Sequence, residues 1–452
     1  MRLTVILSAL LLVASGLRAQ EEFPTVAPTP HPFLTATPHP AAAPAATATP
    51  LVTAAPGTPA APPVTAAPAA TAVPSTTVAP FIVTQPSPAP SQVIPEPDRP
   101  VPPAGVVAPV APQSKTSFAD VARYLAGLPV PETSPLAPLT RDPQWIAHAN
   151  AMNSAFATLE QRQFANIRQW RTEVLSPVTQ ASQACLYLFS GPDFLYPSVF
   201  YPDCRTYLLQ GLEPADPLPD LSAILPAALL GAVQDAETAL NTVLNFSFFK
   251  TKDMRVDLQR GQLKGVIPLL FLFLARSGND VAGLDYVSVD RDGHLLDGRG
   301  GATRGVKISA VNTKSGAQKV IYYFTADLSD DALKRNSGLL RFYESFGHAN
   351  AFVKAASYLM HEPGFNVVRN YLLSASATIL QDDSGIPVRD FTPDQWTLRF
   401  FGTYPGPISL FAKFYQPELH QYYQVSSPKP LTFGFGYRWS RHNSTLILAV
   451  RK

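Results

Sequence analysis

Hydrophobic residues recur along the chain at two spacings, one typical of helices and one of strands. Residues 142–177 start with an Asp-Pro pair typical of a helix start and continue with apolar residues at helical spacing. A second pattern of this kind covers 222–249. The short apolar runs 185–189 and 206–209 predict two strands, which are parallel if the connection between them crosses over.

Further elements follow as far as the C-terminus. We expect strand pairs at 285–290 with 294–296 and at 306–311 with 319–325, helices at 329–346 and 364–375, a strand at 377–380, and a pairing of LTFGFGYRW with STLILAV. The apolar run 266–275 is too short to cross a bilayer, so we interpret it as a buried strand or core helix. The prediction is an α/β domain over 116–452, with a mixed sheet that has several parallel strands and flanking helices.

Residues 1–19 have the order of a secretory signal peptide, with an early arginine, an apolar run and then small residues. We expect an exported protein, periplasmic or extracellular. An uncleaved signal would instead tether it to the membrane, and this is the only membrane association that the sequence suggests. No cysteine follows the apolar run, which excludes a bacterial lipoprotein anchor.

Residues 20–115 consist mainly of proline, alanine, threonine and valine. Such a segment cannot bury enough apolar surface to offset the entropy of ordering, so it is expected to be disordered or partly polyproline II. It would serve as a semi-rigid spacer, and an O-glycosylated stalk is the alternative.

Charge and cysteine content narrow the classes of partner and compartment. Lysine and arginine total 35 against 33 acidic residues, with no block of one sign, so nucleic acid is not an expected partner. The two cysteines, Cys185 and Cys204, are predicted to form a disulfide in an oxidising compartment; two buried free thiols are the alternative.

Carboxylates follow several of the predicted strands. Ligands collect at the carboxyl ends of strands in open α/β sheets, so these acids mark the expected site. They are Asp193, Glu213, Asp327, Asp382 and Asp383. Gathered at one edge, they would suit general acid and base catalysis or a divalent metal. Ordinary helix caps and turns would explain the same residues, and the sequence identifies neither a cofactor nor a metal.

Three further side chains are candidates for this edge. In the stretch Ser190-Gly191-Pro192-Asp193, Ser190 or Gly191 is interpreted as a helix N-cap, and the alternative makes Ser190 a nucleophile. Lys354 lies inside an apolar run, where a lysine either extends to solvent or pairs with an acid. His361 ends that run and is a candidate binding residue.

Five segments resemble a family of exported bacterial proteins of unknown function: YLFSGPDFLYP, YYFTADLSD, KAASYLMH, ILQDDSGIP and FGFGYRW. The resemblance implies an envelope location and carries no activity or site residue. Two hypotheses remain. In the first, the α/β domain binds an envelope partner or a glycan at the end of the spacer. In the second, the protein is a secreted hydrolase that uses strand-end carboxylates, with or without a divalent metal.

Overall fold

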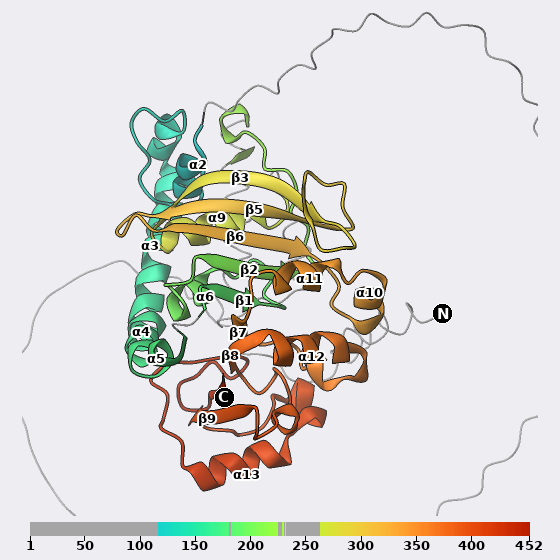
Figure 1. Cartoon of the computed structure of the whole chain (residues 1–452). Helices are drawn as coiled ribbons and strands as arrows, with labels where there is room; N and C mark the ends of the chain where they lie inside the picture. Colours follow the sequence, from blue (N-terminus) through green and yellow to red (C-terminus); the bar gives the residue numbers. More distant parts are fainter. Residues whose placement is uncertain (1–115, 180–181, 225–227, 230, 232–262) are drawn as a thin grey trace, which may run out of the picture. The chain divides into compact units, whose positions relative to one another are not determined.

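A ten-stranded mixed sheet organises the chain in the computed structural model (Figure 1). The structure describes residues 116–179, 182–224, 228, 229, 231 and 263–452. The strand order is β4-β3-β5-β6-β2-β1-β7-β8-β10-β9. The strands are β1 Ala184–Tyr187, β2 Thr206–Gly211, β3 Asn279–Val289, β4 Leu295–Asp297, β5 Thr303–Asn312, β6 Gln318–Thr325, β7 Ala349–Val353, β8 Ser376–Gln381, β9 Trp396–Gly402 and β10 Thr445–Arg451. The predicted α/β class is confirmed.

The predicted signal peptide at 1–19 and spacer at 20–115 lie outside the described residues, as does most of the helix predicted at 222–249. Where that helix was expected to begin, the chain forms a short 3₁₀ turn, η5, at Leu221–Ala223.

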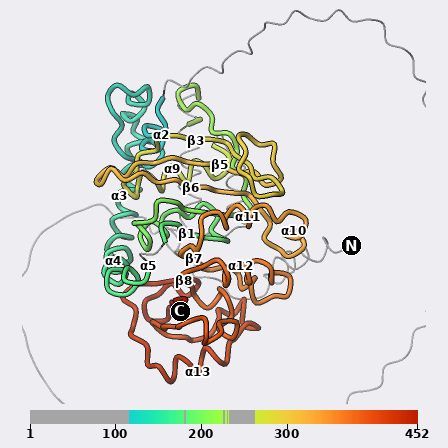
Figure 2. Tube along the Cα trace, viewed as in Figure 1, coloured from blue at the N-terminus to red at the C-terminus, as the bar shows by residue number. Residues whose placement is uncertain are grey.

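The five central strands β6, β2, β1, β7 and β8 are mutually parallel, and antiparallel strands complete the sheet on both sides. Ala184 pairs with Thr206, which confirms the parallel pairing expected of these two segments. All four residues of β1 are buried, as expected for a parallel strand covered on both faces. Figure 2 shows these early strands, in green, lying between later segments of the chain.

Helices cover the two faces of the sheet and bury separate cores. The first face packs against the long helix 143–179 and against α2 (Phe118–Leu125), α6 (Leu195–Phe200) and α9 (Ile267–Arg276). The second packs against α10 (Asp330–Arg335), α11 (Gly338–Glu344) and α12 (Asn366–Ala375). At the β9 edge, α13 (Pro417–Ser426) buries Leu419 and Tyr423 in a third, smaller cluster.

The long helix contains two turns that the sequence pattern did not reveal. Asp142 accepts a hydrogen bond from Gln144 N at 2.8 Å, which confirms the predicted helix start. The helix then runs as α3 (Pro143–Leu159), η3 (Glu160–Phe164), α4 (Ala165–Trp170), η4 (Arg171–Leu175) and α5 (Ser176–Thr179). Both η segments are π-helical. Such turns are rare and are frequent at functional sites.

The apolar run 266–275 forms α9, and the structure therefore selects the core helix from the two alternatives. Every residue from Ile267 to Ala275 is buried. Among the residues that the structure describes, no helix combines the length and the apolar character that crossing a bilayer would require.

Two predictions beyond β6 are wrong in detail. The segment LTFGFGYRW is not a strand: STLILAV contributes β10, which pairs instead with β8 and β9. Gly434 explains this, because a side-chain carbon there would lie 1.3 Å from Trp439 O, an approach that only a tight loop makes. The single helix expected at 329–346 is divided into α10 and α11.

The connections around β1 and β7 create a topological switch point. From β1 the chain passes through α6, on the first face, to β2 on one side. From β7 it passes through α12, on the second face, to β8 on the other side. The carboxyl ends of β1 and β7 therefore mark the place where open α/β sheets usually bind ligands.

The predicted disulfide is absent from the structure, in which Cys185 and Cys204 are both buried free thiols. In the parallel register, the residue opposite Cys185 is Tyr207. Cys204 lies three residues before Tyr207, so the two cysteines are not cross-strand neighbours. Burial raises the pKa of Cys204 to about 12, which disfavours the reactive thiolate.

We therefore expect both thiols to react with a thiol reagent only after unfolding, because neither is accessible in the native protein. The intact mass should equal that of the fully reduced chain, and the melting temperature should be unchanged by reductant. A mass lower by two hydrogens, or a lower melting temperature under reductant, would show that the disulfide exists.

Candidate functional site

A buried ion pair occupies the switch point. Lys354, directly after β7, places Nζ 2.8 Å from Oδ2 of Asp193, in the loop after β1. The two side chains are 1% and 2% exposed. Of the two alternatives for Lys354, the structure selects pairing with an acid.

Aromatic groups surround the pair. Lys354 Nζ lies 3.4 Å from the centroid of the Tyr196 ring, where the cation meets the negative face of the ring. Tyr187 donates a hydrogen bond to Asp193 Oδ2 at 3.2 Å. Burial lowers the pKa of Lys354, and the charges of Asp193 and Asp382 oppose that effect. The lysine is therefore influenced by two acids, although its ion pair is with Asp193.

Asp382 is 1% exposed and saturated with hydrogen bonds. Its Oδ1 accepts from Ser384 N and Oγ, at 3.2 and 2.5 Å. Its Oδ2 accepts from Ala355 N and Tyr437 N, at 3.1 and 3.3 Å. A carboxylate offers about four lone-pair sites, so these donors leave little room for a metal or a substrate proton. Burial nevertheless raises the pKa of Asp382.

Asp383 has a different environment from its neighbour. Its Oδ2 accepts a hydrogen bond from Tyr358 OH at 2.6 Å, and the residue is 5% exposed. Burial, followed by the charge of Asp382, raises the pKa of Asp383 to about 7. This acid is therefore the member of the cluster that titrates near neutral pH.

These bonds hold a strained loop. Ala355, Ser357 and Tyr358 have φ of 51°, 53° and 52°, a region that non-glycine residues rarely occupy. Ser384 Oγ accepts from Ala356 N at 2.8 Å, and Tyr437 OH accepts from Ser357 N at 3.2 Å.

The strain in this loop is thus offset by fixed acceptors on neighbouring elements. The sequence analysis missed Tyr358, Ser384 and Tyr437 as partners of the acids. In the sequence, only the glycine before Tyr437 indicates that the backbone approaches another group closely here. A side-chain carbon at Gly436 would lie 2.0 Å from Asp382 Oδ2.

Ser190 has a structural role and is not placed as a nucleophile. Its hydroxyl contacts Gly191 O and Gln210 O at 2.8 and 3.0 Å and also accepts from Gln210 N. The predicted N-cap at Ser190 or Gly191 is wrong: Asp193 Oδ1 accepts from Tyr196 N at 3.1 Å in the first turn of α6. The SGPD stretch still precedes a helix, but the capping side chain is Asp193 and not Ser190.

The remaining candidate residues are Glu213, Asp327 and His361. Glu213, just after β2, is buried, and its Oε2 is 3.4 Å from the hydroxyl of Tyr323 in β6. Asp327 is exposed and accepts from Ser329 N at 2.8 Å, as a turn residue does. His361 packs against Tyr358, with ring centroids 5.2 Å apart. Burial lowers the pKa of His361 to about 4, so the ring is neutral near pH 7.

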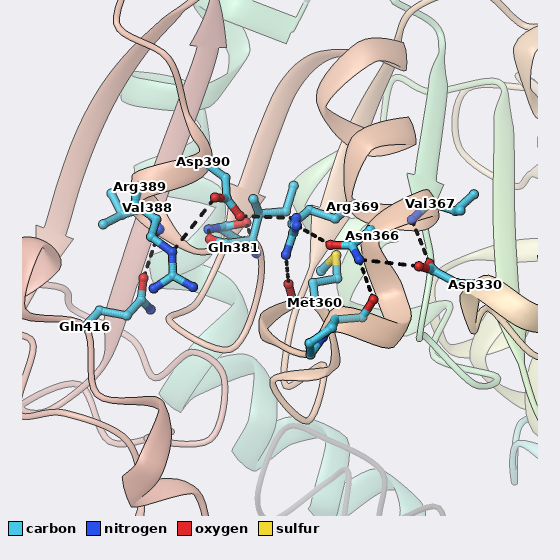
Figure 3. A network of polar contacts seen from close by, with 12 residues as sticks. Asp330, Met360, Asn366, Val367, Arg369, Gln381, Val388, Arg389, Asp390 and Gln416 are labelled. Carbon is cyan, nitrogen blue, oxygen red and sulfur yellow. Dashed lines mark hydrogen bonds and ion pairs between the residues drawn. The ribbon is translucent and has the colours of Figure 1, made fainter. Parts of the chain in front are cut away.

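A second polar network closes the second face of the sheet (Figure 3). Arg369 of α12 donates to Met360 O at 2.8 Å and pairs with Asp390 at 3.2 Å. Asp330 of α10 accepts from Val367 N at 2.8 Å. This network connects α10, α12 and the loop after β8 through hydrogen bonds and an ion pair.

The described residues contain one group that could hold a metal by distance alone. Ligand atoms of Asp290, Asp292 and His294 lie within 4.8 Å of one another in the β3–β4 hairpin. Asp290 Oδ1 accepts from the backbone N of Asp292 and of His294, both at 2.9 Å. The group is thus explained as the tight turn that the sequence predicted.

Comparison with protein-family models, curated proteins and solved structures finds no match to this chain. The resemblance to exported bacterial proteins therefore stays an expectation, and function is inferred from the geometry of this chain alone.

Replacing Lys354 by methionine should lower the free energy of unfolding by about 3–5 kcal/mol, because it leaves Asp193 buried without its counter-charge. A double variant that adds Asp193→Asn should be more stable than the single one, since the amide oxygen still accepts from Tyr196 N. Urea unfolding measures both.

The matched control for that series is Lys413→Met, which removes an exposed ion pair to Glu362 of 2.7 Å. Its cost should stay below about 1 kcal/mol. If Lys354→Met costs no more than this control, the buried pair does not hold the switch point together.

Asp383→Asn should change how stability depends on pH. The pKa of Asp383 is about 7 in the folded protein, above the ordinary value of 3.8, so wild-type stability falls as pH rises from about 4 to 7. The variant lacks this loss. Relative to wild type it should gain on the order of 2–4 kcal/mol between pH 4 and pH 8.

The contribution of His361 has the opposite sign, because its pKa is lowered and stability is lost as pH falls from about 6.5 to 4. Both proteins keep His361, so its contribution cancels in the difference between them, which reports Asp383 together with its effect on the neighbouring Asp382. A difference that does not vary with pH would mean that Asp383 is ionised across this range.

Proposed function

We propose that this is an exported protein of the bacterial envelope whose α/β domain binds a glycan without hydrolysing it. The observation that carries the proposal is a pair of exposed tyrosine rings, Tyr415 and Tyr422, which are 46% and 45% exposed. The expected signal peptide and spacer support an export route and a domain held away from its N-terminal end.

The two rings are the ends of a continuous row of aromatic contacts across β9 and α13. Successive ring centroids lie between 5.2 and 6.1 Å apart. The row is Tyr422, Phe400, Tyr423, Tyr404 and Tyr415. The outer rings stack on inner ones, at interplanar angles of 16° for Tyr422 and 21° for Tyr415.

Hydrogen bonds hold the inner rings in place. Tyr423 donates to Phe401 O and Leu446 O, at 2.9 and 3.1 Å. Tyr404 OH accepts from Gln416 N at 2.9 Å. The exposed rings therefore stack on inner rings that are already fixed. When a ligand packs on them, the protein loses little side-chain entropy.

The chemistry of these rings suits a sugar. The face of an aromatic ring carries partial negative charge and attracts the weakly positive C–H groups on the apolar face of a pyranose. His420 packs against Tyr415, at 5.9 Å between centroids, and its Nε2 is 2.8 Å from Gln424 Nε2. These polar side chains supply the hydrogen-bonding groups that hydroxyls require at the rim of such a surface.

The hydrolase alternative has weaker support. Most of its carboxylates are buried, and their oxygens are largely bonded already: Asp382 has four donors, and Asp193 pairs with Lys354. Asp327 is exposed and accepts from Ser329 N in a turn. The Ser190 hydroxyl is bonded to backbone groups. General acid and base catalysis needs a group within reach of its substrate.

The full-length protein should sediment with insoluble peptidoglycan, and Tyr415→Ala and Tyr422→Ala should each weaken binding about five- to tenfold, as loss of one aromatic contact does. The matched control is Val425→Ala, on the same helix as Tyr422 and 79% exposed. Melting temperatures should agree within a few degrees. The proposal fails if neither tyrosine variant weakens binding, or if the valine variant weakens it equally.

A further inference from the structure

A cavity of about 500 Å³ lies on the first face of the sheet, apart from the aromatic row. Its walls come from the long helix, α6, the end of α9 and the hairpin between β5 and β6. Ligand sites in proteins commonly measure about 300–1,000 Å³, so the cavity is large enough for a small organic molecule.

The charge of this lining is strongly positive. Four cations line the cavity against one acid, Glu160, which gives 4 − 1 = +3. The cations are Arg168, Arg171, Arg276 and Lys314. The whole chain has a net charge of only +2, so the concentration of cations here is a local feature.

The positive charges of Arg168 and Arg171 lie close together and repel each other. Arg168 pairs with Glu160, and its pKa is lowered by burial and then by the charge of Arg171. Like charges three residues apart on a helix repel each other. Glu160 thus pairs with one of two neighbouring guanidinium groups, that of Arg168.

Two buried donors in the lining residues lack acceptors. Arg171 Nε and Arg276 Nη2 have no hydrogen-bond partner among the described residues. The other nitrogens of Arg276 are occupied, Nε by Ala126 O and Nη1 by Asn153 Oδ1, both at 2.8 Å. A buried charged donor without an acceptor is unfavourable, and an anion in the cavity would accept from both residues.

Both π-helical turns belong to this wall. Glu160 and Phe164 are the ends of η3, and Arg171 begins η4. Lining residues recur every three or four positions from Phe156 to Arg171, which places them on one face of the helix. The irregular turns of the long helix therefore coincide with the cavity, as π-turns do at many functional sites.

The rest of the lining is largely apolar, with Phe156, Phe164, Leu195 and Val199 among its residues. Guanidinium groups match phosphate and carboxylate oxygens in a bidentate geometry. An apolar wall beside a cluster of arginines fits a molecule that is anionic at one end and apolar at the other.

We propose that this cavity binds a small amphiphilic anion, with its phosphate or carboxylate group held by Arg168, Arg171 and Arg276. Its apolar part packs against the two phenylalanines and Leu195. This site goes beyond the proposed function, because it uses none of the residues of the aromatic row.

The test uses the full-length protein and four probes in calorimetric titrations: octyl phosphate, octanoate, inorganic phosphate and octanol. We expect the two amphiphilic anions to bind at least tenfold more tightly than inorganic phosphate or octanol. The affinity should fall as salt increases. Equal binding of inorganic phosphate would mean a free-phosphate site, and equal binding of octanol a purely apolar one; either result overturns the proposal.

Two variants test the positively charged lining, so that a folding defect in one of them does not decide the result. Arg171→Gln should weaken octyl phosphate binding about tenfold, as loss of one charged contact does. Lys314→Glu, at an exposed position of the hairpin, should weaken it by a similar factor. The control is Arg291→Gln, exposed in the β3–β4 turn, which should bind normally. Unchanged affinity in both lining variants overturns the proposal.

Discussion

The rest of the parallel sheet depends on one buried interaction, the ion pair between Lys354 and Asp193. It occupies the switch point, where helices depart to opposite faces and leave the ends of β1 and β7 without a covering helix of their own. A lysine buried at this position is tolerable only with a counter-charge, and Asp193 supplies it at 2.8 Å. The same acid starts α6 through Tyr196 N, so one carboxylate fixes both the lysine and the crossover helix.

That constraint extends to the strained loop after β7. Lys354 is followed by a turn in which three non-glycine residues are left-handed. Such a turn persists only where its surroundings fix it, and Asp382, Ser384 and Tyr437 do so from separate elements. Asp193 and Asp382 therefore act as hydrogen-bond acceptors for the backbone, which accounts for their burial, whereas Asp383 accepts from the Tyr358 hydroxyl.

Much of the fold could be predicted from the sequence, whereas the contacts that the strand-end residues make could not. Apolar periodicity identified the α/β class and the parallel pair β1 and β2, because these depend on local patterns. The pairing of Lys354 with Asp193 spans 161 positions, and no local pattern encodes such a contact. The same limit explains the error at LTFGFGYRW, where alternating aromatics suggested a strand but the glycines serve a loop that caps Asp382.

Because the ion pair occupies the switch point, it also determines where a ligand can bind. In a sheet with an open crevice, polar groups at strand ends remain available to a ligand. Here they are bonded to one another, so available groups must be sought on elements added around the parallel core. The aromatic row lies on β9 and α13 at one edge, and the cationic cavity lies along the long helix on the first face. Both surfaces lie outside the parallel core, and hydrogen bonds hold several of their side chains in place, which favours binding by preorganised groups.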